Sequence, residues 1–151
     1  MHSKRRGHAV LEFAFFLPYL IFMFVGAFDL GVYSWALVST ESAARAAALY
    51  TSSSSSNASN SAAACSIATL QMADAPNIAA SQTVSNGNFG TTNTCTSNPL
   101  TVSAALVSSG PDGSSASQVT VTYQTPTLIP IPGTLLGQFT ITRTVEMRVR
   151  S

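Results

Sequence analysis

The sequence is dominated by one long apolar stretch near its N-terminus. It runs from Ala9 to Val38, and Glu12 and Asp29 are its only charged residues. At a helical rise of about 1.5 Å per residue, about thirty residues extend roughly 45 Å, which exceeds the roughly 30 Å hydrocarbon core of a bilayer. The stretch therefore predicts a helix that can span a membrane.

A short basic segment, which contains Lys4, Arg5 and Arg6, precedes this stretch. Because basic residues beside a membrane helix tend to stay in the cytoplasm, we expect the N-terminus there and everything after Val38 across the membrane. The main alternative is a cleaved secretory signal, for which Ala44-Arg45-Ala46 offers a small-x-small cleavage site. The apolar region of a signal is usually about 7–15 residues long, so length favours a retained helix.

Composition and residue types give little sign of chemistry. Charged residues make up 9% of the chain and the net charge is +1, which indicates no nucleic-acid surface. Both histidines, His2 and His8, lie at the predicted cytoplasmic end. The sequence contains no Ser-His pairing, no metal-ligand spacing and no phosphate-binding glycine loop after a strand. We therefore expect no enzyme activity, no cofactor, no metal site and no small-molecule substrate.

The chain divides into four expected segments: a leader over 1–7, a transmembrane and extended helix over 8–50, a Ser-rich linker over 51–61, and an exported domain over 62–151. The helix should continue past the membrane because its end is rich in alanine. Pro18 should bend it locally. The serine run of the linker predicts a flexible break.

The exported domain should be small and of the α+β class. A short helix is predicted over 62–73, capped by Asn60 or Ser61, and the next segment, 77–99, is expected to be mostly loop with a short strand near 82–85. The sequence then alternates apolar and polar residues around 100–106, 119–124 and 139–149, which predicts three half-buried strands. These should form an antiparallel sheet that buries its apolar face on the exported part of the long helix. The apolar loop over 126–137 should cover the sheet, touch the membrane or meet a partner.

Two cysteines, Cys65 and Cys95, lie in the exported part. An even number of cysteines in an oxidising compartment favours one disulfide, and closing a loop of this length should contribute about 3–4 kcal/mol. The alternative is a pair of free buried thiols.

The order of residues at the start of the chain resembles a known processing signal. Basic residues, Gly7, Glu12 and then an apolar helix are similar to the class III leader of type IV pilins. In that family a prepilin peptidase cuts after the glycine, which here implies a cut between Gly7 and His8. The new α-amine of His8 and the Glu12 carboxylate on neighbouring helices would offset each other's desolvation and set the register between subunits. The alternative reading places Glu12 in the headgroup region without a partner.

The first fifty residues more specifically resemble TadE-like proteins of the tight-adherence (Flp, type IVb) pilus systems. The residues that carry this are Arg5-Arg6-Gly7, Glu12-Phe13-Ala14, Leu17-Pro18, Asp29-Leu30-Gly31 and Ala43-Ala44-Arg45-Ala46-Ala47. The resemblance implies a processed pseudopilin or minor pilin, needed for pilus assembly, adhesion and biofilm formation. Residue by residue, it gives Glu12, Phe13, Pro18 and Asp29 roles in helix register and assembly.

The resemblance also implies a place and partners. The protein would sit in a bacterial inner membrane as a single-pass chain, with its C-terminal domain in the periplasm, in the pilus or at its base. Its partners would be the membrane, a prepilin peptidase, other pilins and membrane proteins of the Tad secretion machine. Asp29, about 26 Å from Glu12 along a helix, would lie solvated at the outer interface or paired with another helix in the bilayer. The alternative function is a signal-anchored periplasmic or surface binding domain unrelated to pili.

Overall fold

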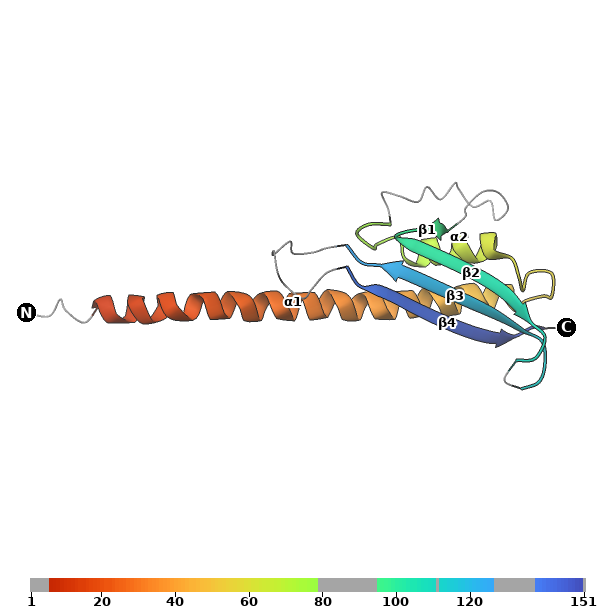
Figure 1. The fold of residues 1–151 in the computed structure, drawn as a ribbon, viewed down its shortest axis with the longest axis horizontal. Coiled ribbons are helices and arrows are strands. Elements are labelled where there is room, and N and C mark those ends of the chain that lie inside the picture. Colours follow the sequence, from red (N-terminus) through yellow and green to blue (C-terminus); the bar gives the residue numbers. More distant parts are fainter. Residues whose placement is uncertain (1–5, 79–94, 111, 127–137, 151) are drawn as a thin grey trace, which may run out of the picture. The chain divides into compact units, whose positions relative to one another are not determined.

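Figure 1 shows the fold in a computed structural model, which describes residues 6–78, 95–110, 112–126 and 138–150. The elements, in chain order, are α1 (Arg6–Thr51), α2 (Ser61–Gln71), β1 (Thr96–Ser97), β2 (Leu100–Val107), β3 (Ala116–Gln124) and β4 (Thr140–Arg148). The chain divides into two compact units, Met1–Ser34 and Trp35–Ser151, with the boundary inside α1. The expected α+β class, with a long N-terminal helix, a short helix and an antiparallel sheet, is confirmed.

Helix α1 continues without a break through Pro18. Proline cannot donate a backbone hydrogen bond, but Leu17 and Leu20 nearby are strong helix formers and favour continuation of the helix. After the apolar stretch the helix is alanine-rich, and Arg45 pairs with Glu41 one turn earlier on its surface. This explains why α1 extends to Thr51, close to the expected end.

The sheet has the strand order β1-β2-β3-β4, and all neighbours are antiparallel. Its inner face comes from the odd-numbered positions of β3 and β4 and the even-numbered positions of β2, because residues in a strand alternate between faces. Val119, Val121 and Tyr123 form the buried centre of this face. The outer face carries threonines, and hydrogen-bonded pairs such as Thr120–Thr144 join β3 to β4.

The C-terminal half of α1 contributes a stripe of small residues to the core of the second unit. The stripe is fully or almost fully buried and consists of Ala36, Thr40, Ala43, Ala44, Ala47, Ala48 and Thr51. Ser117 on the inner face of β3 joins the sheet to the end of this stripe, because its Oγ lies 2.7 Å from Thr51 Oγ1 and 2.9 Å from the carbonyl oxygen of Ala58. The expected packing of the sheet on the exported part of the long helix is therefore present.

Helix α2 begins where its capping residue predicts. The Asn60 side chain accepts a hydrogen bond from Ala63 N at 3.0 Å, which satisfies one of the free N–H groups of the first turn. Cys65, Ala68 and Met72, three and four residues apart, lie on its buried side. Cys65 and Cys95 form a disulfide that ties α2 to the segment before β1.

Two regions differ from the expectation of plain loop. The Ser-rich segment between α1 and α2 is a series of turns in which Ser52 and Ala58 are buried, and the carbonyl of Ser52 accepts a hydrogen bond from Arg150 N at 2.9 Å. Strand β1 is a two-residue pairing with β2 that alternation cannot predict. The strand expected near 82–85 and most of the apolar loop over 126–137 lie outside the described residues.

Candidate functional site

The first unit presents an apolar surface that nothing in the described chain covers. From Val10 to Phe24 every side chain is exposed, and the aromatic residues are among the most exposed: Phe15 at 78%, Phe24 at 73% and Phe22 at 66%. The helix is long and apolar enough to cross a membrane, with a mean hydropathy of 2.1. Because water does not favour such a surface, it requires lipid or other helices around it.

The residues that resemble a leader signal lie at the beginning of this helix. Gly7 and His8 are in the first turn of α1, and Glu12 lies one turn later, with an exposed side chain. Phe13, beside Glu12, is 61% exposed. The carboxylate thus lies on a surface open to neighbouring helices.

Asp29 lies at the other end of the apolar stretch, between exposed Phe28 and exposed Leu30. Its side chain is half-buried. No ion pair joins Asp29 to any of the described residues. Glu12 and Asp29, seventeen residues apart, therefore lie near opposite ends of the apolar segment, about 26 Å apart along the axis.

The C-terminal half of α1 has a second exposed face, opposite the buried alanine stripe. This face, which we call the exposed seam, consists of Trp35, Val38, Ser42, Arg45 and Leu49. The intervals alternate between three and four residues, which is the spacing of a helix that packs lengthwise against another helix. A cavity of about 320 Å³, lined among the described residues by Val38, Glu41, Ser42 and Arg45, lies on the same face.

Residues with catalytic or metal-binding chemistry do not gather anywhere in the described chain. No group of three or more His, Cys, Asp or Glu residues that could hold a metal ion is found there. Three of the four carboxylates of the second unit have separate partners: Glu41 pairs with Arg45, Asp112 with Arg148, and Glu146 with the amide of Gln118. The fourth, Asp74, is exposed just after α2.

Sequence reasoning missed the exposed seam. The signal that could have found it is the complementary pattern on α1, in which small residues alternate with Trp35, Val38 and Leu49 at heptad spacing. The seam is short and contains Ser42 and Arg45, so counting apolar residues alone does not detect it.

Residues 7–49 match the family model described as "TadE-like protein". The match covers the leader-like glycine, Glu12, the apolar stretch and the exposed seam. It agrees with the resemblance drawn from the sequence. No curated protein and no solved structure matches the chain.

Proposed function

We propose that this chain, with its TadE-like N-terminal segment, is a membrane-anchored pseudopilin or minor pilin. It acts in the assembly of a Flp (type IVb, tight-adherence) pilus and supports adhesion and biofilm formation. The observation that carries the proposal is the uncovered apolar surface of α1, which begins at a leader-like glycine and holds Glu12 as its only carboxylate before Asp29. Lipid would cover the apolar surface of this helix while the subunit is held in the membrane, and neighbouring helices would cover it after assembly.

The packing of α1 supports retention of the helix rather than removal with a signal peptide. A cut at the Ala44-Arg45-Ala46 site would remove Ala36, Thr40 and Ala43 from the core of the second unit, all of which are at most 1% exposed. The sheet would then lose part of the surface on which its inner face packs. The domain therefore favours a chain that keeps its helix.

Glu12 has a physical role in this proposal. A carboxylate within a bilayer costs up to about 2.5–3.5 kcal/mol at the centre on insertion scales, and less near the interface. A cut after Gly7 would create an α-amine on His8, and that ammonium group on one helix can pair with Glu12 on the next. Such a pair lowers the cost of both charges only at one relative height of the helices, so it selects the register of assembly.

The exposed seam supports contacts outside the membrane as well. Trp35, Val38 and Leu49 would bury apolar surface against a partner helix, while Arg45 prefers an acidic residue opposite. The partners in this proposal are a prepilin peptidase, other pilins and membrane proteins of the Tad secretion machine. The protein would reside in a bacterial inner membrane with its N-terminus in the cytoplasm and its second unit in the periplasm, in the fibre or at its base.

A second candidate function is a signal-anchored periplasmic or surface binding domain with no connection to pili. The sheet and disulfide of the second unit are compatible with it. It differs from the first in one respect that can be measured, because it requires no cut at Gly7.

The intact mass of the membrane-extracted chain separates the two functions. Co-expression with a prepilin peptidase should give a chain that begins at His8, and Gly7→Leu should abolish the cut. Glu12→Ala should leave processing intact but reduce pilus assembly, whereas Asp74→Ala, which removes an exposed carboxylate outside α1, serves as the matched control. A chain that still begins at Met1 with the peptidase active would refute the pseudopilin function and support the anchored binding domain.

A further inference from the structure

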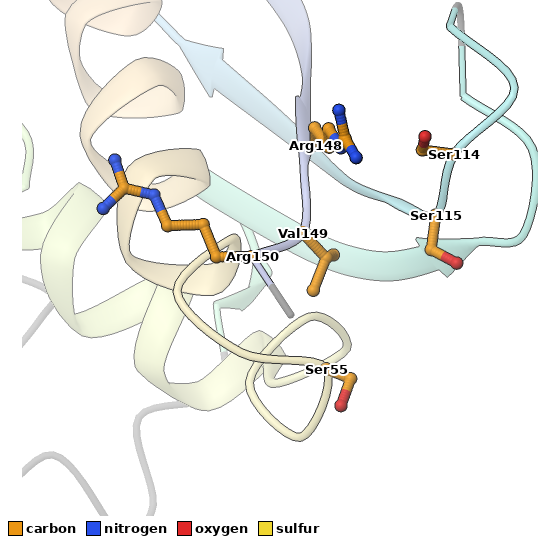
Figure 2. A pocket seen from close by; sticks show the side chains of 6 residues that line it. All are labelled: Ser55, Ser114, Ser115, Arg148, Val149 and Arg150. Carbon is orange, nitrogen blue, oxygen red and sulfur yellow. The ribbon is translucent and has the colours of Figure 1, made fainter.

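Three segments of the second unit meet at a small cavity that the proposed role in pili does not use. They are the loop after α1, the turn between β2 and β3, and the end of β4. The cavity has a volume of about 260 Å³, and its described lining residues are Ser55, Ser114, Ser115, Arg148, Val149 and Arg150 (Figure 2). None of these residues is acidic, so the wall consists of hydrogen-bond donors, two of them cationic, around one apolar side chain.

Backbone hydrogen bonds hold the three segments in place. Val149 N donates to the carbonyl of Ser115, and Arg150 N donates to the carbonyl of Ser52, both at 2.9 Å. The main-chain N–H groups of Val149 and Arg150 are therefore already hydrogen-bonded within the protein. A ligand in the cavity would bind to the side chains that line it.

The turn that carries Ser114 and Ser115 is itself firmly built. Gly110 N donates to the Ser114 carbonyl at 2.8 Å, and Gly113 N donates to the Gly110 carbonyl at 2.9 Å. Gly113 has a φ of 75°, a conformation that side-chain-bearing residues rarely adopt. The positions of the two serines are thus fixed by the turn rather than by a ligand.

Arg148 and Ser114 lie on the same side of the cavity (Figure 2). The Ser115 hydroxyl points away from Arg148, and Arg150 projects to the other side of Val149. No hydrogen bond engages the hydroxyl of Ser114 among the residues that the structure describes. A guanidinium group is a rigid fork of N–H donors, and a hydroxyl group beside it adds a further donor for an oxyanion.

Asp112 is the acidic group that competes for Arg148. Its Oδ2 lies 3.8 Å from Arg148 Nη1, and the two side chains are 49% and 71% exposed. Its Oδ1 accepts a hydrogen bond from Ser114 N at 3.3 Å, which keeps the carboxylate on the turn. An exposed pair at this distance is weak and screened by water, so an anion that also contacts Ser114 can displace it.

We propose that Arg148 and Ser114 bind a phosphate monoester group. The oxygens of a phosphate point in tetrahedral directions and can reach donors from the turn and from β4 at once. A planar carboxylate is satisfied by the guanidinium fork alone and gains less from Ser114. The phosphate belongs either to a small soluble ligand or to a lipid headgroup, since both present the same group.

Glycerol 3-phosphate is the probe, titrated onto the full chain in phosphatidylcholine nanodiscs and followed by calorimetry. Binding should saturate, and Arg148→Gln should weaken it by about tenfold or more because the charged donor is lost. Asp112→Asn should tighten binding severalfold, because it removes the competing charge and keeps the Oδ1 acceptor for the turn. Arg143→Gln is the matched control: it makes the same charge change on the same strand and should alter the affinity less than twofold.

The source of the phosphate is tested in nanodiscs that also contain phosphatidic acid. If the headgroup occupies the site, the affinity for the soluble probe falls there, and an unchanged affinity assigns the site to soluble phosphates. The absence of saturable binding would overturn the proposal. Equal effects of Arg148→Gln and Arg143→Gln would also overturn it, since they would indicate diffuse attraction, as would tighter binding of glucuronate than of glycerol 3-phosphate.

Discussion

The disulfide between Cys65 and Cys95 should supply a large part of the stability of the second unit. The two cysteines are separated by 30 residues. Closing a loop of that size removes about 12 cal/mol/K of chain entropy from the unfolded state, or about 3.7 kcal/mol at room temperature. Small domains have only about 5–15 kcal/mol in total, so reduction should bring this one close to unfolding.

The loss can be measured on the full chain in a non-ionic detergent by pulse proteolysis in urea, which reports unfolding of the second unit. With a urea m-value of about 1.5 kcal/mol/M, the expected loss lowers the midpoint by about 2.5 M. Two forms separate loop closure from packing. Reduced wild type keeps both buried sulfur atoms, whereas the Cys65→Ala, Cys95→Ala double variant removes them.

Loop closure predicts that the two forms lose similar stability. If reduced wild type unfolds at nearly the same urea concentration as the oxidised chain, the entropic argument is wrong. A large loss confined to the double variant would then assign the effect to packing of the sulfur atoms.

Three further changes test other parts of the second unit. Burial raises the pKa of Tyr123, whose hydroxyl donates to Asn77 Oδ1 at 2.8 Å. The protonated phenol of Tyr123 therefore stabilises the folded state at any pH below the pKa of tyrosine in the unfolded chain, about 10. This stabilisation is lost as the pH rises through the higher pKa that Tyr123 has in the folded state. Tyr123→Phe should cost about 0.5–1.5 kcal/mol at neutral pH and flatten the alkaline loss in urea titrations, and an unchanged alkaline slope would contradict this. Ala47→Leu should cost about 1–3 kcal/mol by overfilling the stripe, against little change for exposed Ser42→Leu, and equal costs would argue against close packing there. Arg143→Val should promote self-association, measured by light scattering, because an inward-facing charge on edge strand β4 hinders pairing with another chain; a variant that stays as dispersed as wild type would show that this charge does not protect the edge.

Helix α1 and three of the strands could be predicted from the periodicity of the sequence. The apolar stretch predicted α1, and the alternation around Val102, Val119 and Val145 predicted three strands with the correct faces, since the side-chain period of a strand is fixed at two. The cap at Asn60 placed the start of α2 because its side chain satisfies a specific backbone donor.

The remaining features depend on contacts between distant segments. Ser52 is buried because Arg150, about a hundred residues later, donates a hydrogen bond to its carbonyl, and no local pattern records that. The same holds for the cavity, where Ser114 looks like an ordinary turn residue until β4 brings Arg148 beside it. At the candidate assembly site, the sequence identified Glu12 from its neighbours in the chain, but the exposed seam appears only when the opposite face of α1 is seen to be buried.

The hydrogen bond from Arg150 to Ser52 has a consequence for the order of folding. The segment after β4 closes onto the end of α1, so the core of the second unit joins two walls that lie about a hundred residues apart in the sequence. Until β4 is in place, β3 lacks one of its two partners and the alanine stripe is only partly covered. The core of the second unit therefore cannot close around α1 before β4 has been made.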